Sequence, residues 1–303
     1  KTTPNLERED IISYRNAISN GMHTLAGTPF IMTRKPIEKE YIYKVYPEKS
    51  IISAYKEAGY KTYYVSYLGN VIAGDDAINQ IVNEADKYIK RPYGYHGNGD
   101  SEGLPIINEI LESDKSEKRL IVYKLIGSHF HFQDRYPSQF DIYQPSFKTV
   151  KFKGPNIDQK EIFINSYDNS ILHTDYVVSS IINKLKDETG DVVLGFISDH
   201  GTGLYEDNKT LYNGYSRANY DIAYFFWLNQ NVKDRLGNKN LSMLRENVDK
   251  PIDQTYFIDT MFKISGIVSD KQIGKTLFSE ISDNDDRKVI VGDEVKFYRD
   301  ILK

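Results

Sequence analysis

Helical and extended sequence patterns alternate along this chain of 303 residues, and this alternation limits the possible folds more than any other feature. Residues 51–58 place apolar side chains on one helical face, Gly59 ends that pattern, and an extended run rich in Tyr and Val follows over 61–67. Strands separated by helices favour a parallel sheet covered on both faces. We therefore expect an α/β fold, a three-layer sandwich with a mostly parallel central sheet between two layers of helices.

The remaining segments continue the alternation. Helices are predicted over 75–89, 103–113, 167–190 and 253–265; strands are predicted over 118–126, 192–198 and 222–228. The run 120–126 is expected to be buried on both faces. Residues 286–303 alternate in character and predict an edge hairpin. Because no repeat, low-complexity tract or linker divides the chain, we predict one domain over residues 1–303.

Composition excludes several classes of function. The formal net charge of −4 provides no basic surface, so nucleic acid is not an expected partner. With no cysteine, the chain has no disulfide, thiolate metal site or cysteine nucleophile. None of its apolar runs approaches the roughly 18 residues that a membrane-spanning helix requires.

Two of the predicted strands end in polar residues that could carry chemistry. Gly127-Ser128-His129 follows one strand, and Ser198-Asp199-His200-Gly201 follows the other. Ligands of open α/β sheets bind beyond the carboxyl ends of the strands, so these residues are expected to converge. Asp and neutral His are suitable ligands for zinc or manganese. An Asp199 that caps a helix beside a His200 that only completes a turn would fit the same sequence.

Thr24 precedes the short apolar run 25–32, which predicts a helix beginning at or near it. A hydroxyl at a helix N-terminus is well placed to handle phosphate, because unpaired N–H groups and the positive end of the helix dipole surround it. The alternative is that Thr24 is simply the N-cap of that helix.

Five stretches together resemble the phosphoethanolamine transferases: TTPNL (2–6), SNGMHTLAGTPFIMT (19–33), GSHFHFQDRYP (127–137), YDNSILHTDYVV (167–178) and ISDHG (197–201). These enzymes belong to the alkaline phosphatase and sulfatase superfamily and include members that modify lipid A and confer polymyxin resistance. The stretches occur in the family's order and span about two thirds of the chain, which makes them more specific than any single motif. The resemblance implies a sulfatase-like catalytic domain.

The resemblance also implies roles for individual residues. Thr24 falls on the family's nucleophile, which contacts zinc as well; Asp199 and His200 fall on its zinc ligands, and His129 on a histidine that contacts the substrate phosphate or a second zinc. Lys124 and Asn213 stand where family members have histidines, and they are candidate substrate-binding residues. Because Asn213 replaces one of those histidines, one zinc site is expected rather than two.

Several expectations concern parts of the protein beyond these residues. In the family, a glutamate from a Gly-Glu-Ser strand end completes the zinc site and a membrane anchor precedes the domain, so we expect both upstream of residue 1. The implied setting is the periplasmic face of the bacterial inner membrane. The implied donor is phosphatidylethanolamine, and the acceptor is lipid A, a lipooligosaccharide sugar, a glucan or a protein. A monomer is expected.

Three alternative functions remain open from the sequence. A phosphoglycerol transferase or a phosphodiesterase of the same superfamily would use the same threonine and zinc. A non-catalytic relative could serve as a binding module, which is favoured by Thr202 and Asn213 where the family pattern differs, and is opposed by the retained Thr24, Asp199 and His200.

Overall fold

The computed structural model describes residues 1–42, 48–66, 76–90, 99–114, 116–212, 214–269 and 274–301. The chain groups into two compact units. The first unit contains Lys1–Glu9, Gly59–Gly74 and Ala85–Glu188, and the second contains Asp10–Ala58, Asp75–Glu84 and Thr189–Lys303. The prediction of one domain over residues 1–303 stays a prediction.

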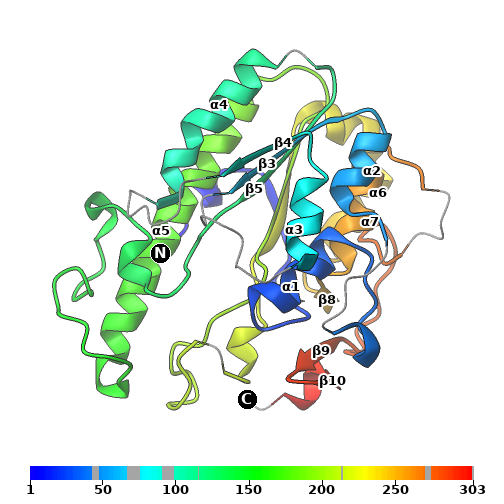
Figure 1. The fold of residues 1–303 in the computed structure, drawn as a ribbon. Helices are drawn as coiled ribbons and strands as arrows, with labels where there is room; N and C mark the ends of the chain where they lie inside the picture. Colours follow the sequence, from blue (N-terminus) through cyan, green and yellow to red (C-terminus); the bar gives the residue numbers. More distant parts are fainter. Residues whose placement is uncertain are drawn as a thin grey trace. The chain divides into compact units, whose positions relative to one another are not determined.

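The first unit is built on a parallel sheet in which β3 (Lys61–Ser66) lies between β4 (Lys87–Lys90) and β5 (Arg119–Lys124). Two helices, α4 (Leu104–Ser113) and α5 (Lys160–Leu185), lie beside this sheet (Figure 1). The core between them contains Tyr63, Val65, Ile107, Ile110 and Leu111. The three α4 residues follow the spacing of one helical face, so burial of that face holds α4 on the sheet. Short 3-10 turns complete the unit: η1 (Leu6–Arg8), η3 (Gly99–Gly103), η4 (Phe132–Asp134), η5 (Ser138–Phe140) and η6 (Ile157–Gln159).

The second unit contains an antiparallel sheet in which β7 (Tyr224–Leu228) lies between β1 (Ile11–Ser13) and β6 (Val193–Ile197). Helix α7 (Tyr256–Ile264) covers part of it, because Phe257 stacks on Phe226 with ring centroids 5.9 Å apart. Helix α2 (Ile51–Glu57) packs on α7, where the Tyr55 hydroxyl donates to the Met261 carbonyl at 3.2 Å. Three further helices belong to this unit: α1 (Thr24–Met32), α3 (Asp76–Asn83) and α6 (Gln230–Glu246).

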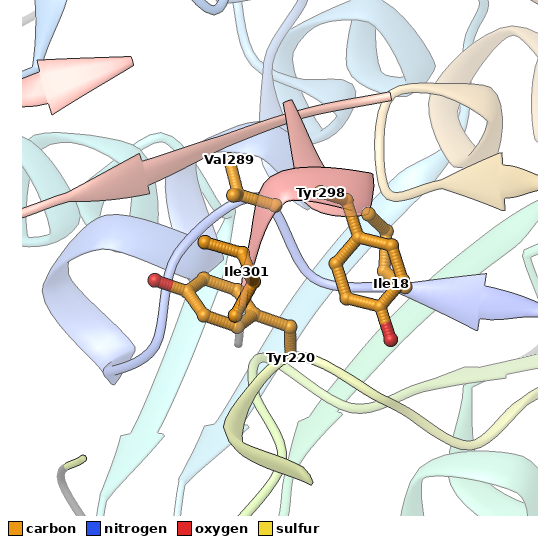
Figure 2. Close-up of a cluster of buried hydrophobic side chains, with 5 residues drawn as sticks. All are labelled: Ile18, Tyr220, Val289, Tyr298 and Ile301. Atoms are coloured by element: carbon orange, nitrogen blue, oxygen red, sulfur yellow. The ribbon is translucent and has the colours of Figure 1, made fainter. Parts of the chain in front are cut away.

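Two short strand pairs lie outside the larger sheets. Strand β2 (Ala17–Ile18) pairs in parallel with β8 (Ile252–Asp253), and β9 (Lys288–Val291) forms an antiparallel hairpin with β10 (Glu294–Phe297). The hairpin predicted for the tail is thereby confirmed. It is followed by the turn η8 (Tyr298–Asp300). Figure 2 shows the buried cluster that joins this tail to the rest of the second unit: Ile18, Tyr220, Val289, Tyr298 and Ile301.

Two details of the predicted elements were wrong. The helix expected over 75–89 ends at Asn83, and Lys87–Lys90 is strand β4. Asp86 explains the change, because its carboxylate accepts from the Thr62 N–H at 2.9 Å and its own N–H donates to the Thr62 hydroxyl at 2.9 Å, which sets the segment in register beside β3. The run 120–126 is half-buried except for Leu120, so it is not buried on both faces.

A buried histidine makes the stability of the first unit dependent on pH. His173 on α5 is 1% exposed, and its Nδ1 donates to the Arg135 carbonyl at 2.9 Å. Burial lowers the pKa of His173 to about 4, because the charged ring loses its hydration. The unfolded chain, with a histidine pKa near 6.5, therefore binds more protons than the folded chain between these values, and stability falls as pH falls through this window.

We expect the free energy of unfolding to drop by about 2 kcal/mol between pH 7 and pH 5 through His173 alone. The variant His173→Gln keeps a donor for the Arg135 carbonyl but does not titrate. The free energy of unfolding of this variant, obtained from urea unfolding curves, should therefore change by about 2 kcal/mol less between pH 7 and pH 5 than that of the native protein. Identical pH dependence in the two proteins would refute the assignment.

Candidate active site

Helix α1 begins at Thr24, as the sequence predicted, but its N-cap is His23. The His23 ring accepts the Ala26 N–H through Nδ1 at 3.3 Å, so the interpretation of Thr24 as the N-cap is wrong. Thr24 is half-buried at the first helical position. Among the residues that the structure describes, neither its hydroxyl nor its N–H has a hydrogen-bond partner. Both groups are therefore available to a ligand at the positive end of the helix.

The turn after β6 carries Asp199 and His200. The Ser198 N–H donates to the Ala223 carbonyl at 3.0 Å, and the Gly201 N–H donates to the Asn219 carbonyl at 2.9 Å. In the described part of this segment the next helical turn is η7 (Arg217–Asn219), so Asp199 caps no helix. Its Oδ1 instead accepts the His200 N–H at 3.1 Å.

The hydrogen bonds of His200 fix which ring nitrogen is free. Its Nδ1 lies 2.7 Å from the Gly201 carbonyl oxygen, which can only accept, so Nδ1 carries the proton. The lone pair is therefore on Nε2. Metal-binding histidines usually show this arrangement, in which one ring nitrogen donates to a carbonyl and the other faces the metal.

Helix α1 and the Asp199 turn meet at Gly27. A Cβ added at Gly27 would lie 1.9 Å from the Asp199 carbonyl oxygen, so only glycine allows this approach. The same carbonyl accepts from the Ser19 hydroxyl at 2.7 Å and from the Gln254 Nε2 at 2.8 Å. Since Thr24 lies one turn before Gly27, the structure brings Thr24, Asp199 and His200 into one neighbourhood of the second unit.

Ser19 and Gln254 hold this neighbourhood together, and sequence reasoning missed both. Gln254 is fully buried; its Nε2 also donates to the Ser198 carbonyl at 3.0 Å, and its Oε1 accepts the Asn20 N–H at 3.0 Å. A single amide thus joins the segment before α1 to the turn after β6. The only signal in the sequence is that Ser19 opens one of the motif stretches, whereas Gln254 has no local signal.

Loop 216–221 packs against the turn that carries Asp199 and His200. A Cβ at Gly201 would lie 2.2 Å from the Ala218 carbonyl, so the turn packs closely on this loop. The loop is held in place by the hairpin β9–β10 and the following turn η8: the Tyr220 hydroxyl donates to the Ile290 carbonyl at 2.8 Å, and the Tyr298 hydroxyl donates to Asp221. The rings of Tyr220 and Tyr298 belong to the buried cluster of Figure 2. The tail therefore contributes to the geometry of the turn.

The electrostatics of this neighbourhood couple its two histidines. Burial lowers the pKa of His23, the charge of His200 lowers it further, and the Asp199 carboxylate opposes both effects.

In the part of the chain that the structure describes, no group of three or more His, Cys, Asp or Glu residues is arranged to hold a metal ion. Asp199, His200 and the Thr24 hydroxyl fit zinc by donor type, and they would supply three of the four ligands that zinc usually takes.

The other predicted site residues belong to the first unit or lie outside the described residues. Lys124 is the last residue of β5 in the first unit, and His129 is exposed in the loop that follows. The His129 Nδ1 lies 2.6 Å from the Phe130 carbonyl oxygen, so Nδ1 carries the proton and Nε2 holds the lone pair. Asn213 lies outside the described residues.

Comparison with known proteins places this chain among similar sequences and folds. The family model described as Sulfatase matches residues 1–267. Phosphoethanolamine transferase EptC of Escherichia coli is 26% identical over 238 residues, which are 76% of this chain and 40% of that protein. Phosphoethanolamine transferase EptA of Salmonella typhimurium is 25% identical over 284 residues, 88% of this chain and 49% of that protein. This chain therefore spans half or less of the length of these relatives.

A solved structure shows the same fold. The C-terminal periplasmic domain of EptC from Escherichia coli, in complex with Zn, superposes with a TM-score of 0.83 at 21% identity and covers 99% of this chain and 86% of that one. The predicted α/β fold of the alkaline phosphatase and sulfatase type is confirmed by this likeness, and the relatives' names confirm the resemblance seen in the motifs. Within the described residues, no helix is both long and apolar enough to span a bilayer.

Proposed function

Because the chain belongs to the sulfatase family, we propose that it is the catalytic part of an enzyme that transfers phosphoethanolamine from phosphatidylethanolamine to an envelope acceptor through a covalent intermediate on Thr24. The observation that carries the proposal is the position of Thr24. Thr24 opens α1, one turn from the glycine that contacts the Asp199 carbonyl, and its hydroxyl has no hydrogen-bond partner in the part of the chain that the structure describes. The names of the relatives support the choice of the transferred group.

Asp199 and the His200 Nε2 would hold zinc, together with Thr24 and an anionic ligand from outside these residues. Bound there, zinc would lower the pKa of the Thr24 hydroxyl and offset charge on the phosphoryl oxygens. The chain's own contribution is positional. The bonds from Ser19 and Gln254 fix Asp199, and the bond to the Gly201 carbonyl fixes the tautomer of His200.

In the first step, the Thr24 oxygen attacks the phosphorus of the donor. The new Oγ–P bond forms as the bond from phosphorus to the glycerol oxygen breaks; the hydroxyl proton leaves, and the released diacylglycerol takes up a proton. In the second step, an acceptor oxygen attacks the same phosphorus as the Oγ–P bond breaks; the acceptor hydroxyl loses its proton, and the Thr24 oxygen takes up a proton. The N–H groups of Thr24 and Leu25 at the start of α1 would stabilise the phosphoryl oxygens, and we propose that His129 contacts the same phosphate.

The proposed setting is the periplasmic face of the bacterial inner membrane, where donor lipid and envelope glycans are present. Its support is the likeness to a periplasmic domain. Lipid A, a lipooligosaccharide sugar, a glucan and a protein are the candidate acceptors.

The test is to map the adduct. We expect mass spectrometry of the full-length protein incubated with zinc and phosphatidylethanolamine, without acceptor, to show phosphoethanolamine on the peptide that contains Thr24. The Thr24→Ala protein should show none, because alanine has no hydroxyl that could attack the phosphorus. A modified Thr24→Ala protein would contradict the assignment of the nucleophile.

The same experiment distinguishes the alternatives. A phosphoglycerol adduct formed from phosphatidylglycerol would indicate the related phosphoglycerol transferase. Release of phosphoethanolamine to water at the rate of diacylglycerol release would indicate a phosphodiesterase. A protein that binds lipid without forming any adduct would be a binding module.

A further inference from the structure

A buried carboxylate accepts hydrogen bonds from the backbone just before His129. Asp100 in η3 is 1% exposed, and its two oxygens accept the N–H groups of Ile126 and Gly127, each at 2.8 Å. These are the last two peptides before Ser128 and His129. Gly127 has a φ of +56°, so the chain turns sharply at the residue that Asp100 holds.

The following peptides of the loop are also fixed. The Ser170 hydroxyl donates to the Ser128 hydroxyl at 2.7 Å, and the Arg135 Nε donates to the His129 carbonyl at 2.9 Å. The Arg135 carbonyl in turn accepts from the buried His173. Every residue from 126 to 129 therefore has a defined hydrogen-bond partner within the first unit, and Asp100 supplies two of those bonds.

Burying a carboxylate at this position costs solvation free energy. Burial raises the pKa of Asp100, which reflects the cost of holding a charge away from water, while the two N–H donors lower it. An asparagine of the same size could accept only one of the two N–H groups, and its NH2 would face the other donor. A buried anion that accepts two adjacent N–H groups fixes the loop's orientation more strictly than any neutral side chain of that size.

We propose that Asp100 is a positioning residue for His129, which it orients through the peptides of Ile126 and Gly127. The inference rests on the proposed function, in which His129 contacts the substrate phosphate. Asp100 itself is not placed to touch the substrate, because it is 1% exposed and each of its carboxylate oxygens accepts a backbone N–H. Its loss should therefore reduce turnover rather than donor binding.

The test compares Asp100→Asn with Asp114→Asn, which is a matched control. Asp114 also accepts a backbone N–H, from Ser116 at 2.9 Å, and a Tyr63 hydroxyl at 2.8 Å, but it lies near the opposite end of β5 from His129. Amide hydrogen exchange of the zinc-loaded protein without substrate is the first measurement. The second is the rate of Thr24 modification against the concentration of phosphatidylethanolamine; its maximum gives kcat for this half-reaction, and its half-saturating concentration gives KM.

For Asp100→Asn, we expect faster exchange at Ile126 and Gly127 and a fall in kcat of about 100-fold with KM changed less than about threefold, since a displacement of about 1 Å can cost this much. Asp114→Asn should leave the exchange rates at Ile126 and Gly127 unchanged, and likewise kcat and KM. If the Asp100 variant does not fold, Tyr123→Phe replaces it, because the Tyr123 hydroxyl donates to the Asp100 carbonyl and its removal should shift kcat in the same direction by less.

The outcomes separate this inference from the proposed function. Native exchange rates at Ile126 and Gly127 in Asp100→Asn would overturn the inference, as would faster exchange with an unchanged kcat. Both results leave the Thr24 intermediate intact. A native protein that forms no Thr24 adduct would instead overturn the proposed function, and the inference with it.

Discussion

Replacing Asp199 with Asn is expected to weaken zinc binding by at least about 100-fold and to abolish phosphoethanolamine transfer. Changes to groups that merely orient metal ligands cost about 10- to 100-fold in affinity, so removing the charge of a ligand should cost no less. The substitution keeps the size of the side chain. The backbone carbonyl of residue 199 would still accept from Ser19 and Gln254, so the fold of the turn should be retained.

Zinc affinity is measured by competition with a chelator of known affinity, and transfer by the appearance of the Thr24 adduct. The matched control is Asp191→Asn, which lies before the start of the same strand, β6. Asp191 forms a surface ion pair with Arg235, and its loss should cost at most about 1 kcal/mol of stability and no zinc affinity. If Asp199→Asn binds zinc as tightly as the Asp191 variant, Asp199 is not a ligand.

The elements that the sequence predicted well are those whose periodicity is local. Helix α2 ends at Glu57, two residues before Gly59, whose φ of +84° only glycine adopts readily. The apolar face of the helix and its end could therefore both be predicted from consecutive residues. Strand β7 is buried along its whole length, and its run of aromatic residues indicates this directly. Thr24 opens its helix for the same local reason: the apolar run begins immediately after it.

The missed elements depend on distant partners. Strands β1, β2 and β8 have two or three residues each, too few for a periodicity, and exist because they pair with other strands. Helix α6 was not predicted because most of its residues are polar or charged and Gly237, with a φ of +70°, interrupts it. The residues of β4 continue the apolar periodicity of the helix before them, so the local sequence predicts helix there. The contact of Asp86 with Thr62, which places them in the sheet, is not visible in the local sequence.

The candidate site divides in the same way. Residue types and motif spacing pointed to Thr24, Asp199, His200 and His129 as residues that could carry chemistry. The groups that orient them, Gln254 and Asp100, are ordinary polar residues in the sequence and become distinctive only through complete burial and their hydrogen bonds to distant backbone groups. Reactive residues can be recognised by type, whereas positioning residues are recognised by contact.

Gly27→Ala is expected to damage the site although alanine is the better helix former. In a helix interior this exchange alone should stabilise the protein by about 1 kcal/mol. Here the added methyl would meet the Asp199 carbonyl oxygen at 1.9 Å, which requires α1 and the Asp199 turn to move apart. Overpacking of this kind costs about 1–3 kcal/mol, so we expect a net loss of stability of up to about 2 kcal/mol.

The larger effect of Gly27→Ala should be on transfer, which we expect to fall by at least about 100-fold, because the separation displaces Thr24 from Asp199 and His200. The matched control is Gly203→Ala in the segment after the turn, where the nearest atom of the described residues to the added methyl would be the Thr210 carbonyl oxygen at 3.2 Å. Urea unfolding measures the first effect, and the rate of Thr24 modification measures the second. A Gly27→Ala protein that gains stability and keeps its transfer rate would show that α1 does not rest on the Asp199 carbonyl, and the proposed alignment of nucleophile and metal ligands would then be wrong.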